Sequence, residues 1–158
     1  MNMLSLFNWL GNTSVGLAIQ ESNWGIATGE MVHLLALAAM GGTILLVDLR
    51  LFGIGMKRQP ASRLARELSP VFWTSLAVMF VSGVLILSGE TMKCYYNPAF
   101  RLKMLLLFFA LLFHATFHRN AVASATGTVS SFRSKSAAAL SLALWLSVGL
   151  AGRAIGYL

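Results

Sequence analysis

Four long stretches of consecutive apolar residues constrain what this chain can fold into. A helix needs about 20 residues to cross the roughly 30 Å hydrocarbon core of a bilayer, and each stretch reaches that length once its flanking turns are added. Because the apolar residues are consecutive and do not alternate with polar ones, the pattern excludes a transmembrane β-barrel. We therefore predict an all-α integral membrane protein that folds as a four-helix bundle. The stretches cover residues 31–47, 71–88, 104–117 and 137–152.

Two prolines indicate where helices begin. Pro70 and Pro98 lie just before the second and third stretches, and proline is tolerated in the first turn of a helix, where its missing N–H would have no partner. Both prolines therefore predict helix starts, and Asn97 is a candidate N-cap for the third helix. The transmembrane helices are expected at about 29–52, 70–89, 98–119 and 137–157, within a single domain of residues 1–158.

The first 28 residues differ from the rest of the chain. Residues 4–10 (LSLFNWL) are short, aromatic and uncharged, residues 11–14 (GNTS) interrupt them, and VGLAIQ follows. This pattern is typical of short amphipathic helices that lie in the membrane interface. The alternative is a mobile tail. The segment has no Lys or Arg, so we do not expect a cleaved signal peptide.

The composition argues against a soluble enzyme. Of the 158 residues, 57% are hydrophobic and 11% are charged, whereas an ordinary soluble domain has about 25% charged residues. Twelve Lys and Arg against five Asp and Glu give a net charge of +7. In a hydrophobic chain such charges mark the cytoplasmic side of a membrane. The expected partner is therefore the lipid bilayer and not nucleic acid.

The positions of the basic residues predict the orientation. Eight lie in the segment that follows the first stretch and between the third and fourth stretches, and four lie on the opposite side. The positive-inside rule places the larger group in the cytoplasm, so both termini are expected outside. The larger group comprises Arg50, Lys57, Arg58, Arg63, Arg66, Arg119, Arg133 and Lys135, and the smaller group comprises Lys93, Arg101, Lys103 and Arg153.

Ionisable residues within a membrane span are costly and are functional candidates by default. His33 lies 15 residues before Asp48, or about 22 Å along a helix. Lys103 lies 16 residues before Arg119, or about 24 Å. His33 and Lys103 are therefore expected at similar depth, near the outer face. A neutral imidazole can ligate a metal or haem iron, and the lysine could be a second ligand or a proton donor. Alternatively, His33 bonds a neighbour and Lys103 snorkels to the interface.

A second group of ionisable residues is expected nearer the cytoplasm. His114 and His118 are four residues apart and share a helix face with Lys103. Such a histidine pair can bind a transition metal such as copper when another helix supplies further ligands, and Asp48 is the obvious candidate. We therefore count His33, His114, His118 and Asp48 as candidate metal ligands. For His118 the alternative is an interfacial residue beside Arg119.

Three segments resemble known membrane proteins: HLLALAAMGGTILLVDLRLFG, NPAFRLKMLLLFFALLFH and GRAIGY. They resemble a family of uncharacterised bacterial four-helix membrane proteins and, more distantly, the HemJ-type protoporphyrinogen oxidases and the CopD-type copper-resistance proteins. Those proteins share an early histidine and a lysine eleven residues before a later histidine, which match His33, Lys103 and His114. The resemblance implies a bacterial cytoplasmic membrane protein with His33 and Lys103 at a haem.

These observations favour a b-type haem protein that transfers electrons within the membrane. His33 would be an axial ligand, with Lys103 or a water opposite, and His114 is a further candidate. Arg153 could pair with a haem propionate, because guanidinium binds carboxylate bidentately. A quinone or another membrane protein would exchange the electrons. Two alternatives remain open: a non-catalytic transmembrane subunit of a homo- or hetero-oligomeric complex, and a copper or other metal-ion permease.

Overall fold

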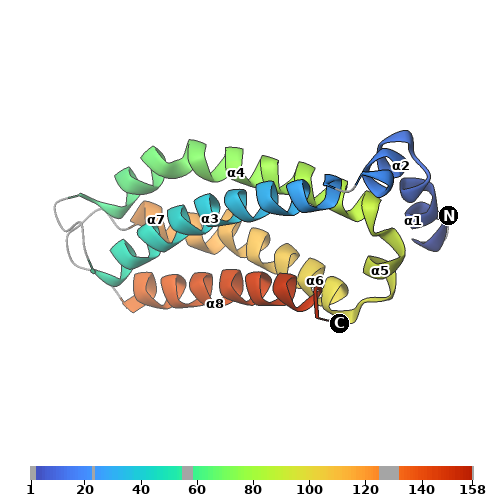
Figure 1. Cartoon of the computed structure of the whole chain (residues 1–158). Coiled ribbons are helices and arrows are strands. Elements are labelled where there is room, and N and C mark those ends of the chain that lie inside the picture. The colour runs from blue at the N-terminus through green and yellow to red at the C-terminus, as the bar shows by residue number, and fades with distance from the viewer. Residues whose placement is uncertain (1–2, 23, 55–58, 125–131, 158) are drawn as a thin grey trace.

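Four long helices form an elongated bundle in the computed structural model (Figure 1). The structure describes residues 3–22, 24–54, 59–124 and 132–157, and no strand occurs in these ranges. All four helices are long and apolar enough to cross a membrane, which confirms the predicted all-α four-helix membrane architecture. The membrane-crossing segments lie in α3 (Gly25–Phe52), α4 (Ala61–Gly89), α6 (Pro98–Phe113) with its continuation, and α8 (Phe132–Ala154).

The second membrane helix begins earlier than predicted. Helix α4 starts at Ala61, so the expected start at Pro70 is wrong and this proline lies inside the helix. The turns before Pro70 are polar and therefore fall outside the apolar stretch; Arg63 and Glu67 form an i, i+4 ion pair of 2.9 Å there. Prolines are tolerated inside membrane helices, and the Pro70 carbonyl accepts a hydrogen bond from the Thr74 hydroxyl at 2.8 Å.

The third membrane helix begins where predicted but changes its winding. Asn97 caps α6, since its side-chain oxygen accepts from the backbone N–H of Ala99 at 2.9 Å. A π-helical turn, η1 (His114–His118), then interrupts the expected 98–119 helix, and α7 (Arg119–Ser124) continues it. A π turn contains i→i+5 hydrogen bonds and occurs frequently at functional sites. The fourth helix spans Phe132–Ala154, shifted toward the N-terminus from the predicted 137–157.

Three short helices gather at one end of the bundle, beside both chain termini (Figure 1). We call this the terminal end, and the opposite end the loop end. The helices are α1 (Met3–Gly11), α2 (Ser14–Glu21) and α5 (Thr91–Tyr96). Phe7 of α1 packs edge-on against Tyr95 and Phe100, with ring centroids 5.4 and 6.3 Å apart. The N-terminal segment therefore forms two short helices, as predicted, and both are packed against the bundle.

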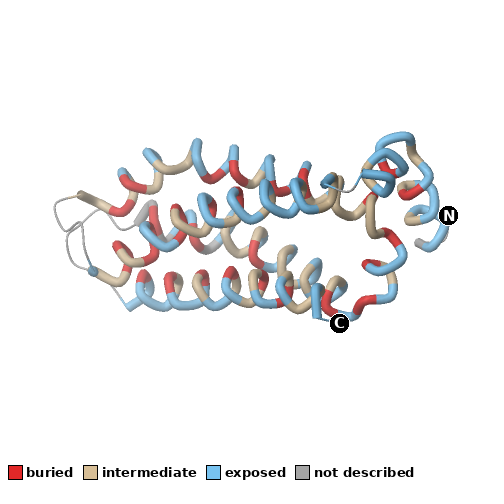
Figure 2. Tube along the Cα trace, viewed as in Figure 1, coloured by how far each residue is buried: buried red, intermediate tan, exposed pale blue. Residues whose placement is uncertain are grey.

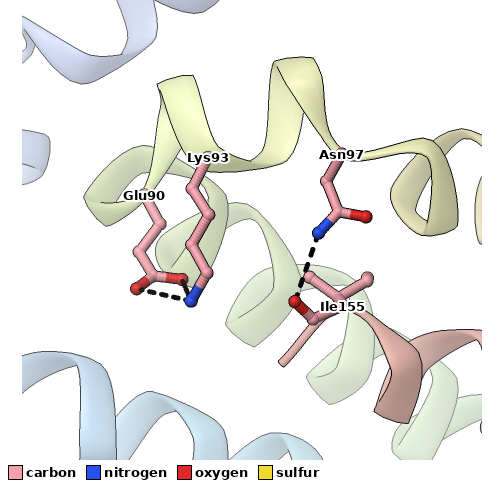
Figure 3. Close-up of polar contacts among 4 residues, drawn as sticks. All are labelled: Glu90, Lys93, Asn97 and Ile155. Carbon is pink, nitrogen blue, oxygen red and sulfur yellow. Dashed lines mark hydrogen bonds and ion pairs between the residues drawn. The ribbon is translucent and has the colours of Figure 1, made fainter. Parts of the chain in front are cut away.

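Polar contacts fasten the terminal end, as Figure 3 shows. The Asn97 side-chain amide donates to the carbonyl of Ile155 at 3.2 Å, which joins the start of α6 to the segment after α8. Lys93 pairs with Glu90 at 3.3 Å within the α5 turn. The Gln20 side chain of α2 also donates to the Ser88 carbonyl of α4 at 3.2 Å. These bonds hold the short helices against the ends of the long ones.

The burial pattern suits an apolar solvent. Large apolar side chains face outward along the helices, for example Phe80 at 73% and Phe108 at 62% exposed (Figure 2). Polar residues are turned inward, and Asp48 and Ser141 are both 0% exposed. Water would penalise so much exposed apolar surface, whereas lipid tails accommodate it. The protein is a membrane protein whose four long helices contact lipid.

Candidate functional site

The first polar centre is His33, in the half of the bundle nearer the terminal end. Its Nδ1 lies 2.9 Å from the Ser82 hydroxyl of α4. The same hydroxyl lies 2.7 Å from the Val78 carbonyl and 3.3 Å from the Met79 carbonyl, and the imidazole also bonds the Met79 backbone. When Ser82 donates to one of these carbonyls, it accepts from Nδ1, and the neutral ring then keeps the lone pair of Nε2.

Lys103 joins His33 in the same half of the bundle. It is half-buried on α6 and close enough to His33 for the charge of one to act on the other. A Cβ placed on Gly152 of α8 would lie 3.5 Å from the Lys103 Nζ, and one on Gly83 of α4 would lie 3.4 Å from Cε1 of His33. The structure thus places the two residues in the same half of the bundle. Glycines of two further helices border them.

Arg153 lies at the terminal end but faces outward. Its guanidinium donates to the Tyr157 hydroxyl at 3.0 Å and stacks on that ring, 4.8 Å from the centroid. The other terminal-end arginine, Arg101, donates to the Tyr95 carbonyl at 3.2 Å. Both arginines are exposed. Arg153 is therefore free to meet an anionic group at the surface of the bundle, and it does not line the interior beside His33.

The second polar centre is a buried pair of side chains, Asp48 and His118, near the loop end. Nε2 of His118 donates to Oδ1 of Asp48 at 2.7 Å, and the two side chains are 4% and 0% exposed. Ser141 of α8 lies beside the same carboxylate. The π turn aims His118 at α3, and the bond ties the third membrane helix to the first. The predicted proximity of Asp48 and His118 is therefore observed.

His114 occupies the next position along this centre. Its ring is stacked between those of Phe72 and His118, with centroids 4.3 and 4.9 Å away. Several buried polar atoms here have no hydrogen-bond partner among the described residues. Such atoms are rare in folded proteins and mark sites for water, protons or ligands. They are Oδ2 of Asp48, Nδ1 of His114, Oγ of Ser141 and Nε1 of Trp145.

The four predicted metal ligands do not form one site. Asp48, His114 and His118 lie together, whereas His33 lies in the other half of the bundle, about 22 Å from Asp48 along their shared helix. Within the described ranges, no three His, Cys, Asp or Glu side chains are arranged to hold a metal ion. Nε2 of His118 is already bound to Asp48. The lone cysteine, Cys94, is buried outside the membrane helices, and burial raises the pKa of its thiol.

Two cavities adjoin the polar centres. The loop-end cavity has a volume of about 380 Å³ and lies between α3, α4, the π turn and α7, with both His114 and His118 in its wall. The terminal-end groove has a volume of about 630 Å³ and lies between α2, α3 and α4, with Ser82 in its wall. Both volumes fall in the range of about 300–1,000 Å³ that is typical of ligand sites.

Four residues of these centres were not predicted as site residues: Ser82, Ser141, Phe72 and Trp145. The two serines could have been selected as candidates because they are polar residues within apolar stretches. Their partners depend on how α4 and α8 are rotated about their axes, which the sequence pattern does not define. Arg50 was predicted only as an orientation marker, yet it is 3% exposed and donates to the Gln59 carbonyl at 2.6 Å.

A family model matches residues 6–158, nearly the whole chain, and its description is a family of unknown function, DUF6644. The chain belongs to this family. The predicted membership of an uncharacterised family is thereby confirmed. No curated protein and no solved structure matches the chain significantly. The comparisons give no relationship of DUF6644 to the HemJ-type or CopD-type proteins.

Proposed function

We propose that this DUF6644 protein is a b-type haem protein that transfers electrons within the membrane, with His33 as an axial ligand. The observation that carries the proposal is the contact of 2.9 Å between Nδ1 of His33 and the Ser82 hydroxyl. With a hydrogen on Nδ1, the neutral ring has the Nε2 lone pair available for a metal. Histidines that ligate metals commonly have this arrangement, in which a second group bonds the other ring nitrogen and sets its orientation.

The neighbours of His33 suit the same cofactor. Lys103, a half-buried amine on another helix, lies close enough to act on His33 electrostatically and would be the second ligand or the partner of a bound water. Gly83 and Gly152 have no Cβ and so let the side chains of His33 and Lys103 pack closely against α4 and α8. Arg153, exposed at the same end, has the guanidinium chemistry that binds a propionate carboxylate. A bound haem would supply one-electron redox chemistry.

The resemblance to HemJ-type proteins supports haem binding at His33 and Lys103, and it does not by itself extend to oxidase activity. The basic residues near the loop end support a cytoplasmic location for that end under the positive-inside rule. Both termini would then lie outside a bacterial cytoplasmic membrane. A quinone or a second membrane protein would exchange electrons with the haem.

The decisive experiment is the visible spectrum of the detergent-purified protein from a haem-replete host, oxidised and reduced. We expect a Soret band that disappears in His33→Phe. The matched control is His114→Phe, the same replacement in the other half of the bundle, and we expect it to keep the band. A colourless wild-type protein overturns the proposal. So does a band that survives His33→Phe and is lost in His114→Phe, because the ligand would then lie near the loop end.

A second function is favoured by one observation. Added Cβ atoms at Gly41, Gly42 and Gly149 would meet no atom within 4 Å, so these glycines leave room for another helix to approach closely. A non-catalytic transmembrane subunit of a larger complex has such faces. Co-purification with a stable partner, together with full function of His33→Phe, supports this alternative. Metal-dependent growth after deletion of the gene would instead support a copper or metal-ion permease.

A further inference from the structure

We propose that the loop-end cavity binds the head group of a membrane quinone, a neutral planar ring with carbonyl oxygens and an apolar tail. The cavity lies far from His33 along the bundle and is therefore a second site. Its walls come from three parts of the chain: α3, α4, and the π turn with α7. Binding of the quinone does not require a haem. The use of the bound quinone as an electron carrier rests on the proposed function.

The lining of the cavity selects an apolar ligand with few polar atoms. Apolar side chains form most of the wall, including Ile44, Phe72 and Val122. The polar groups are the two histidines, a few hydroxyls such as that of Ser69, and the two exposed arginines Arg66 and Arg119. Binding sites of this kind place a small number of polar groups to orient a mainly apolar molecule. A water-soluble metabolite with many hydrogen-bonding groups would leave most of those groups unsatisfied here.

His118 is suited to a carbonyl oxygen. Its Nε2 is bonded to Oδ1 of Asp48 at 2.7 Å, and this bond fixes the orientation of the ring in the cavity wall. The other ring nitrogen, Nδ1, takes no part in the bond to Asp48 and can form a hydrogen bond with a ligand. The carbonyl oxygens of a quinone require a hydrogen-bond donor of this kind.

Aromatic rings supply the flat surface that a quinone ring requires. Phe72 lies parallel to His114 within 17°, and Trp73 follows it in the cavity wall. Trp73 is 52% exposed on the outer surface of α4, where lipid contacts the helix. One wall of the cavity thus reaches the bilayer, and an apolar tail can extend into it. This placement favours a ligand that arrives from the membrane.

Two exposed arginines, Arg66 and Arg119, also border the cavity. Their long side chains lie at the loop end, where basic residues meet lipid headgroups and water. They would attract an anionic amphiphile such as a fatty acid, which is the competing ligand. The buried part of the wall argues against it, because His118 and Phe72, 3% and 5% exposed, offer no cationic side chain there that is free of a carboxylate. The quinone is therefore the ligand we test.

The test measures binding of the short-tailed quinone ubiquinone-1 to the full-length protein in detergent, by calorimetry. Ala65→Phe places a ring in the cavity, and Ala77→Phe makes the same change on the same helix in the terminal-end groove. We expect Ala65→Phe to weaken binding about tenfold or more, and Ala77→Phe to change it less than about twofold. The reverse result places the quinone in the groove and overturns the proposal.

Further variants keep the test decisive. If Ala65→Phe does not fold, Ser69→Phe blocks the same cavity. His118→Gln keeps an N–H donor toward Asp48 but lacks the second ring nitrogen, which is the group offered to the ligand, and we expect it to weaken binding; unchanged binding overturns the role of His118. Decanoate is the anionic comparison, and tighter binding of decanoate that is lost in Arg66→Ala overturns the quinone assignment. Quinone binding is also measured in His33→Phe, which lacks the proposed haem ligand. Binding that persists in this variant shows that the quinone site does not depend on the haem, so the two proposals can fail separately.

Discussion

The two polar centres of the bundle differ in the hydrogen-bond partners and the burial of their histidines. His33 is half-buried and contacts neutral partners, the Ser82 hydroxyl at 2.9 Å and the Met79 backbone. His118 makes a bond to a carboxylate at 2.7 Å, and both side chains are almost fully buried. The first histidine has no acidic partner in this contact, so it suits an added ligand. The second is engaged with Asp48, so it suits the joining of two helices.

The energetic consequences differ in the same way. Removal of one partner from a buried charge pair leaves the other charge uncompensated in a low dielectric. Removal of His33 leaves Ser82 bonded to its own helix through the Val78 carbonyl. We therefore expect the loop-end centre to dominate stability and the terminal-end centre to dominate ligand binding. The following variants test that division.

The largest effect is expected for His118→Ala. It leaves the fully buried Asp48 without its imidazole partner, and breaking a buried pair in this way costs about 3–5 kcal/mol. Thermal unfolding in detergent, followed by circular dichroism, measures the loss. The double variant Asp48→Asn with His118→Gln keeps a neutral hydrogen-bonded pair, and we expect it to regain most of the stability. A single variant as stable as the wild type would contradict the structural role of the pair.

Ser82→Ala is expected to have an intermediate effect on stability and a large effect on the ligand. It removes the acceptor for Nδ1 of a half-buried imidazole, at a cost of about 1 kcal/mol. Loss of a group that orients a metal ligand typically weakens binding about 10–100-fold. Haem titration of the purified variant measures this weakening. Ser75→Ala, a buried serine on the same helix, is the control, and an equal effect of both variants would argue against the assigned tautomer.

His114→Phe is expected to change stability by less than about 1 kcal/mol. The replacement keeps a ring between Phe72 and His118 and removes a buried nitrogen that has no partner among the described residues. Replacing an unsatisfied polar group by an apolar group of the same shape is nearly neutral or stabilising. A loss comparable to that of His118→Ala would mean that His114 also carries a structural bond.

The smallest effect concerns Cys94 at the terminal end. Burial raises the pKa of this thiol, so at neutral pH its thiolate fraction is below that of a free cysteine, and it increases as the pH rises. Maleimide labelling of the folded protein should be slow at pH 7 and should accelerate at higher pH. Labelling at the rate of the unfolded chain at pH 7 would show that α5 opens readily.

The sequence predicted best what depends on hydropathy and helix rise. Consecutive apolar residues identified the four membrane helices, and the 1.5 Å rise per residue placed His33 and Lys103 in the same half of the bundle. Residues outside the apolar stretches were predicted less well, so the polar start of α4 before Pro70 was missed. Contacts that depend on helix rotation, such as Ser82 with His33, could not be predicted from spacing. The π turn was also missed, since no residue pattern in HATFH distinguishes it from an α-helical turn.

The π turn at His114–His118 determines which residues of the third membrane helix face the interior of the bundle. A π turn is equivalent to one residue inserted into an α-helix, so the residues after it keep the faces they would have in an α-helix one residue shorter. If the same residues were wound as an uninterrupted α-helix, every residue after the turn would be rotated by about 100° relative to α6. His118 would no longer face Asp48, although the segment would still qualify as a membrane span. In this protein, one residue of register separates a membrane helix that merely crosses the bilayer from one that carries a buried ion pair.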